Sequence, residues 1–96
     1  MMRSRLTSRF KKPLTIRRTV GNSMLPALND GQILFFSSLF TPKSGDIVLA
    51  RVNGKDLVKR LHAADGKWSL RGDNLGNTLD FEDINKESIL AILLSQ

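Results

Sequence analysis

The chain has 96 residues, no cysteine and a single histidine, and its formal net charge is +6 at pH 7. This length is enough for one small domain with one modest core, since 41% of the residues are hydrophobic. The composition excludes disulfides and thiolate metal sites, and His62 alone cannot hold a metal, so we expect neither a metal nor a cofactor.

The positive charge is concentrated at the N-terminus. Residues 1–18 contain seven basic residues and no acidic one, whereas the rest of the chain contains eight basic and nine acidic residues. We therefore expect a flexible basic arm over residues 1–14 and a single domain over residues 15–96. Such an arm can be solvated or can contact an anionic surface. An anionic membrane stays open as a partner, whereas the absence of a helix-turn-helix pattern argues against nucleic acid.

No segment of the sequence has the pattern of a membrane span. The longest strictly apolar run covers residues 89–94, whereas a spanning helix needs about twenty residues. The basic start is not followed by an apolar segment, so it is not a secretory signal. We expect a cytoplasmic protein without an integral membrane segment, with peripheral membrane contact as the alternative.

The first half of the chain predicts three strands. Residues 15–20 are β-branched at four of six positions, which favours a strand. Residues 32–37, centred on the apolar residues 33–36, predict a second strand that is apolar on both faces, so we expect both faces to be buried. Residues 47–52 form the third strand, after a loop that contains Pro42.

Ser23 follows the first strand at a sharp bend. Gly21 and Asn22 are turn formers, and Pro26 disfavours a helix at the residue before it. Met24 and its apolar neighbours are expected to anchor the bend. A hydroxyl at such a bend can act as a nucleophile in a cleft, but a turn serine commonly bonds its own backbone. The bend by itself leaves both interpretations open.

The second half of the chain continues with short elements. They are a hairpin turn at 53–54, strands over 55–62, 67–71 and 89–94, a turn-rich loop over 72–77, and a polar segment over 80–88 that can hold a short helical turn. Short strands, frequent turns and almost no helical periodicity predict an all-β domain, built as a coiled antiparallel sheet or partial barrel with little helix.

Lys59 is the one charged residue on an apolar strand face. Strand side chains alternate, so Leu57, Lys59 and Leu61 share one face, and His62 lies on the other. A buried ammonium lowers its pKa, and a neutral lysine amine can act as a general base. Alternatively, the lysine stem lies on apolar surface with its amine in water. If Ser23 needs a base, Lys59 is the more economical partner, because both can face one cleft.

Four blocks of sequence, taken together, resemble type I signal peptidases. They are Gly-Asn-Ser-Met-Leu-Pro-Ala-Leu (21–28), Gly-Asp-Ile-Val (45–48), Leu-Val-Lys-Arg-Leu (57–61) and Arg-Gly-Asp-Asn with Thr78 and Asp80 (71–80). The self-cleaving SOS-repressor peptidases share the Ser-Met and Lys-Arg blocks. The resemblance covers about residues 15–94 and implies a serine/lysine peptidase with the signal peptidase catalytic-core fold.

The resemblance also implies roles for single residues. Ser23 matches the nucleophile and Lys59 the general base. Thr78 falls where family members have a serine that hydrogen-bonds the lysine amine, and Asp80 matches the acid of the same box. The backbone N–H of Ser23 would be an oxyanion donor, and Asn22 would be a second one.

The sequence departs from the family pattern in the substrate cleft and in the acid's partner. Gly21 stands where many signal peptidases have a side chain that helps the oxyanion, while Met24 and Pro26 would line the cleft. Phe81 and Glu82 replace the family's Ser-Arg pair, so a salt bridge to the neighbouring acid is lost or comes from another residue.

The N-terminal anchor and the large second β-domain of the longer enzymes are missing from the sequence. What remains resembles the short peptidases that mature nickel superoxide dismutase precursors. The resemblance implies an endopeptidase that removes an N-terminal leader or signal segment from a precursor bound as an extended strand. The alternatives are a regulatory module of the SOS-repressor type and a catalytically inactive peptide-binding relative.

Overall fold

The computed structural model describes residues 13–76 and 78–95. The described chain forms seven strands and one short 3-10 turn, and β1 already includes Leu14 of the predicted arm, whose residues 1–12 lie outside the described part. The elements are β1 (Leu14–Arg18), β2 (Ile33–Ser37), β3 (Ile47–Val52), β4 (Lys55–Ala64), β5 (Lys67–Arg71), β6 (Phe81–Ile84), η1 (Lys86–Ser88) and β7 (Ile89–Ser95).

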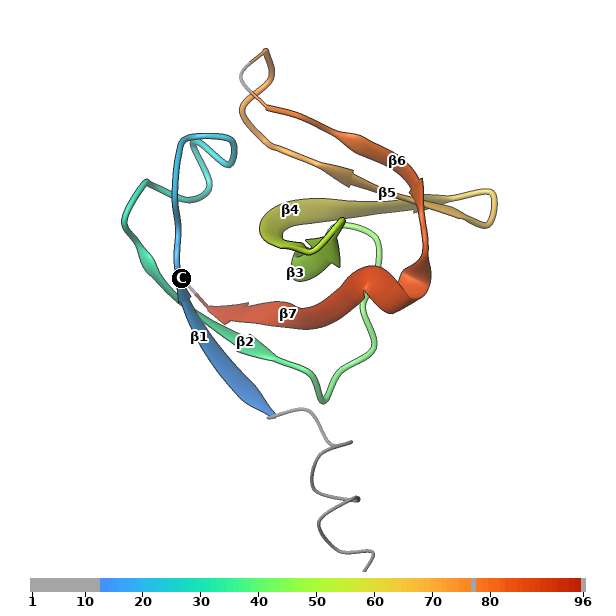
Figure 1. Ribbon diagram of the computed structural model, residues 1–96, viewed down its shortest axis with the longest axis horizontal. Coiled ribbons are helices and arrows are strands. Elements are labelled where there is room, and N and C mark those ends of the chain that lie inside the picture. Colours follow the sequence, from blue (N-terminus) through green and yellow to red (C-terminus); the bar gives the residue numbers. More distant parts are fainter. Residues whose placement is uncertain (1–12, 77, 96) are drawn as a thin grey trace, which may run out of the picture.

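The seven strands form one antiparallel sheet in the order β1-β2-β7-β3-β4-β5-β6. Figure 1 shows the sheet curling, with β1 and β2 on one side of the β3–β4 hairpin and β5 and β6 on the other. The prediction of an all-β fold with a coiled antiparallel sheet is confirmed. The sheet does not close into a barrel, because β1 and β6 remain its two edges.

Strand β3 is the central strand of the sheet, with three strands on each side. Its first four residues are all buried. Alternate side chains of a strand point to opposite faces. Accordingly, Ile47 and Leu49 belong to a core cluster with Met24, whereas Val48 and Ala50 belong to a second cluster. The curled sheet thus covers both faces of this strand.

The expectation that the second strand is buried on both faces is wrong. Leu34 and Phe36 of β2 are fully buried, but Ile33 and Phe35 are 42% and 41% exposed. The reason is position, since β2 lies next to the edge strand β1 and the sheet covers only its inner face.

Strand β6 was not predicted. Its Phe81 lies opposite Leu70 of β5 and packs on the second core cluster, while Glu82 and Asp83 remain exposed. These acidic residues make the segment look like a loop in the sequence. The predicted helical turn is present only as η1, where the Asn85 side chain accepts a hydrogen bond from the Glu87 N–H.

Within the described residues, no helix is both long and apolar enough to cross a membrane.

Candidate active site

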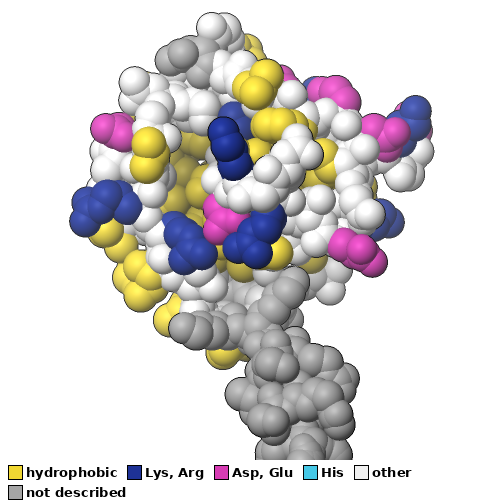
Figure 2. All heavy atoms as spheres, in the orientation of Figure 1, with side chains coloured by type: hydrophobic (Ala, Val, Ile, Leu, Met, Phe, Trp, Pro, Cys, Tyr) yellow, Lys and Arg dark blue, Asp and Glu magenta, His cyan; other side chains and the backbone are white. Residues whose placement is uncertain are grey.

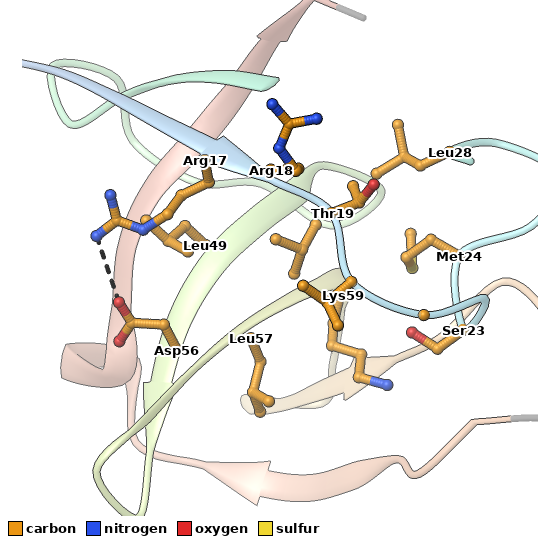
Figure 3. Close-up of a pocket in the computed structure, with 13 residues that line it drawn as sticks. Arg17, Arg18, Thr19, Ser23, Met24, Leu28, Leu49, Asp56, Leu57 and Lys59 are labelled. Carbon is orange, nitrogen blue, oxygen red and sulfur yellow. Dashed lines mark hydrogen bonds and ion pairs between the residues drawn. The ribbon is translucent and has the colours of Figure 1, made fainter. Parts of the chain in front are cut away.

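A cavity of about 210 Å³ lies between the bend that follows β1 and the facing strand β4. Both Ser23 and Lys59 line this cavity, as do Gly21 and Met24. Figure 3 shows the Ser23 hydroxyl and the end of the Lys59 side chain, which comes from β4, at the same end of the cavity. The tertiary structure therefore brings together the two residues that the sequence analysis paired.

Lys59 is 6% exposed, although it carries an amine. Its Nζ donates a hydrogen bond of 2.7 Å to Oγ1 of Thr78, the contact that the family resemblance implied. Burial lowers the pKa of Lys59 below its ordinary value of 10.5, and the negative charge of Asp80 offsets part of that shift. The alternative interpretation, with the amine in bulk water, is wrong.

The bend around Ser23 is anchored from both sides. On the core side, Met24 and Leu28 are almost fully buried, and the N–H of Leu28 donates to the Met24 carbonyl at 2.9 Å. On the other side, the backbone N–H of Asn74 donates to the Ser23 carbonyl at 2.8 Å. The side-chain amide of Asn74 donates to the Asn22 carbonyl, also at 2.8 Å. Because these carbonyls are held by Asn74, the orientation of the Ser23 peptide is fixed.

Gly72 lies directly against the bend and against Thr78. A Cβ at this position would lie 2.0 Å from Oγ1 of Thr78 and 2.6 Å from the carbonyl oxygen of Ser23. Real Cβ atoms are not found at such distances, so any side chain here would push the two groups apart. The close approach of backbone to backbone explains why this position is a glycine.

Arg60, next to Lys59 on β4, makes contacts that sequence reasoning missed. Its guanidinium binds the Asp73 carboxylate through Nε at 3.0 Å and Nη2 at 2.6 Å, and its Nη1 donates to the Gly45 carbonyl at 2.7 Å. This paired geometry is the strong form of an ion pair, and it fixes the loop that carries Asn74. The signal in the sequence was the acid between Gly72 and Asn74, which needs a partner.

Asp80 accepts a hydrogen bond of 3.1 Å from the Gly72 N–H. The four ion pairs found among the described residues do not include Asp80. The partner of Asp80 is therefore the Gly72 N–H, whereas the family resemblance implied an arginine. Glu82, which replaces that arginine in the sequence, pairs instead with Arg71 at 3.3 Å.

Two predicted site residues lie away from the cavity wall. Asn22 and Pro26 are exposed, and neither is among the residues that line the cavity. Gly21 lines it with a φ of +88°, a conformation that favours glycine, and its N–H donates to Asp30 at 2.8 Å. The described residues contain no group of three or more histidines, cysteines or carboxylates that could hold a metal.

The fold and this cavity can be compared with known families. The family model described as Peptidase S24-like matches residues 3–93, nearly the whole sequence. The chain belongs to this family, and hence to the serine peptidase superfamily that includes the signal peptidases and the SOS-repressor peptidases. A comparison with curated proteins finds no significant match.

Proposed function

We propose that this protein is a serine endopeptidase in which Ser23 is the nucleophile and Lys59 the general base. The observation that carries the proposal is the buried Lys59 amine, which is hydrogen-bonded to Thr78 in a cavity that Ser23 also lines. A serine hydroxyl is a weak nucleophile until a neighbouring base takes its proton. Desolvation favours the neutral amine, the form that can act as that base.

The proposed reaction has two steps. In the first, the neutral amine of Lys59 takes the Ser23 proton while Oγ attacks the scissile carbonyl, and the resulting ammonium then protonates the leaving amine. In the second, Lys59 activates a water that hydrolyses the acyl-enzyme. The backbone N–H of Ser23 is the proposed oxyanion donor, a kind of contact typically worth about 10²–10³ in rate. The exposed Asn22 side chain is the candidate for a second donor once substrate is bound.

The proposed substrate is a precursor protein from which an N-terminal leader or signal segment is removed. An extended segment fits here because β1 is an edge strand and the cavity lies between the end of β1 and β4. The short peptidases that mature nickel superoxide dismutase precursors, which the sequence resembles, suggest the same kind of reaction.

Cleavage of a co-expressed candidate precursor, followed by intact-mass spectrometry, tests the proposed dyad. We expect Ser23→Ala and Lys59→Met each to abolish cleavage while the circular dichroism spectrum is unchanged. Matched controls are Ser44→Ala and Lys43→Met, because both residues are exposed and neither lines the cavity. Cleavage by either dyad variant at the wild-type rate would exclude the dyad.

A regulatory peptidase of the SOS-repressor type is the second candidate. The matching Peptidase S24-like family lies in the superfamily that includes the SOS-repressor peptidases. Such a module cuts its own chain or a repressor partner. Incubation of the purified protein at alkaline pH separates the two candidates. Self-cleavage that Ser23→Ala prevents would favour the regulatory module, whereas an intact chain that still cuts a precursor would favour leader removal.

We further propose that the protein contacts anionic membranes through the outer face of β1 and β2. This face exposes Ile16 and Phe35, which lie directly opposite each other, with Leu14 and Ile33 beside them. Residues 3–12, just before β1, carry five basic residues and no acid. Exposed apolar side chains next to clustered basic ones are typical of peripheral binding to anionic lipid.

Sedimentation with vesicles tests this contact. We expect binding to vesicles that contain phosphatidylserine, weaker binding to purely zwitterionic ones, and a loss of binding in Phe35→Ser. Leu75→Ser is the control, because Leu75 is exposed but lies on a loop far along the chain from this face. Equal binding of both variants and wild type would exclude the β1–β2 face.

A further inference from the structure

The cavity that holds Ser23 and Lys59 continues to a cluster of charged residues. Arg17, Arg18 and Asp56 line its wall together with the proposed dyad. Figure 3 shows Arg17 and Asp56 at the end of the cavity away from Ser23. On the face seen in Figure 2, basic side chains gather beside a hollow with a hydrophobic floor, and an acidic side chain lies between them.

The negative charge of Asp56 is already balanced by Arg51, without Arg17. Arg51 holds its carboxylate through Nε at 2.7 Å and Nη2 at 3.3 Å, and Arg51 is the largest cause of the lowered pKa of Asp56. Arg17 adds a single contact of 3.4 Å, and its side chain is 42% exposed. An exposed ion pair of this length is weak, so the Arg17 guanidinium can turn to another carboxylate at little cost.

The cavity wall therefore has an excess of positive charge. Of the described residues that line the cavity, Asp56 is the only acid, whereas Arg17 and Arg18 are both cationic. Arg18 lies opposite Ile33 on the outer face of β1, and Figure 3 shows its guanidinium turned away from Lys59, where it donates to the Gly31 carbonyl. The positive charge at this end of the cavity therefore comes from Arg17, because Arg51 already balances Asp56. Lys59, which also lines the cavity, carries no negative charge in either protonation state.

Strand spacing fixes how far this charge lies from the reacting bond. Asp56 precedes Lys59 by three residues on β4, which corresponds to about 10 Å at a rise of about 3.3 Å per residue. A substrate segment extended in the cavity advances by the same rise. The rise gives only the distance along the strand, since Asp56 and Lys59 point to opposite faces of β4. A substrate residue beside Arg17 therefore lies about 10 Å, or about three residues, from the bond next to the dyad.

We infer that this end of the cavity is a subsite for an acidic side chain of the substrate, about three residues from the scissile bond, with Arg17 as the residue that reads it. The inference rests on the proposed endopeptidase function and adds the charge of its substrate. The chain's own residues 1–12 carry five basic residues and no acid, so they do not fit this subsite.

A mixture of short synthetic peptides of random sequence tests the subsite, with the cleaved products sequenced by mass spectrometry. We expect Glu and Asp to be enriched over Lys and Arg about three residues from the cut, on one side of it. Single peptides that carry Glu, Gln or Lys there give the size of the effect in kcat/KM. The Glu peptide should exceed the Lys peptide by about three- to tenfold at low salt, and less at high salt.

Charge reversal assigns the preference to one residue. Arg17→Glu should invert the order of the Glu and Lys peptides. Arg71→Glu is the matched control, since Arg71 is 46% exposed, makes one ion pair of 3.3 Å and does not line the cavity. An unchanged preference in Arg17→Glu, or the same inversion in Arg71→Glu, would overturn the assignment to Arg17.

Failure of the subsite and failure of the enzyme give different results. Equal cleavage of the Glu, Gln and Lys peptides would overturn the subsite and leave the endopeptidase standing. If no peptide is cleaved, the same three peptides are compared as fluorescent ligands of Ser23→Ala. Tighter binding of the Glu peptide there supports the subsite, and equal or absent binding overturns it.

Discussion

The Nζ of Lys59 lies 2.7 Å from Oγ1 of Thr78, a hydroxyl 19 residues further along the chain. The partner of this buried amine is thus an uncharged group that can accept or donate a hydrogen bond. The neighbouring carboxylate, Asp80, acts on the amine through space and bonds the Gly72 N–H instead. Because no carboxylate holds the amine directly, its neutral form is not strongly disfavoured.

Thr78→Val removes the hydrogen bond to Lys59 and conserves the shape of the side chain. We expect kcat to fall about tenfold, because a hydrogen bond net worth about 1 kcal/mol or somewhat more is lost at the proposed base. Thr78→Ser keeps the hydroxyl and should retain most of the activity. Equal rates for the Val and Ser variants would show that the Lys59–Thr78 contact does not matter for catalysis.

Activity should rise with pH as the Lys59 ammonium loses its proton. The midpoint should lie below 10.5, because burial lowers the pKa of Lys59 in the folded protein. Asp80 is the charged group that raises this pKa, so Asp80→Asn should move the rising limb to lower pH. The amide oxygen can still accept from Gly72, which keeps the loop in place. A limb that stays fixed, or moves to higher pH, would contradict the role of Lys59 as base.

Lys59 should also make the stability of the fold depend on pH. Its pKa is lower in the folded chain than the ordinary 10.5, so between these two values the unfolded chain binds more protons and stability rises with pH. The Lys59→Met variant lacks this contribution of residue 59 to the pH dependence of stability. Urea titrations at several pH values should therefore show the Met variant most favoured at low pH, with its advantage over wild type shrinking as the pH approaches 10.5. An advantage that grows with pH would rule this out.

Gly72→Ala should damage the site more than the fold. The added Cβ would meet Thr78 and the Ser23 carbonyl, and overpacking of this kind costs about 1–3 kcal/mol. Gly66→Ala is the control, since its φ of +76° brings backbone strain of about 1 kcal/mol but no atom lies within 4 Å. We expect both variants to melt earlier in a thermal scan, and only the Gly72 variant to lose activity. Comparable activity in both would argue against the tight contact at Gly72.

The strands that the sequence predicted best are β3 and β5. The bounds of β3 and β5 agree with the predicted ranges, since each is a run of strand-forming residues between clear turns. Sequence reasoning failed where contacts with distant parts of the chain determine the structure. In β6, for example, Phe81 packs on the core and holds the polar residues of this strand in the sheet. It also failed for β2, where one face is left open beside the edge strand.

The same division applies to the candidate site. Strand alternation alone predicted that Lys59 shares a face with Leu57 and Leu61, because the side chains of one strand obey a fixed period of two. The contacts of Arg60 with Asp73, and of Asn74 with the bend, were not predicted, because they join segments that are distant in the sequence.

The sequence by itself determined the all-β class, the bend at Ser23 and the apolar face that carries Lys59. These follow from local rules of turn formation and strand alternation, which act within a few residues. Only the tertiary structure decided that Ser23 and Lys59 line one cavity and that Thr78 binds the amine. The curl of the sheet brings Gly72 and Asn74 against the bend, and no local pattern specifies how a sheet curls.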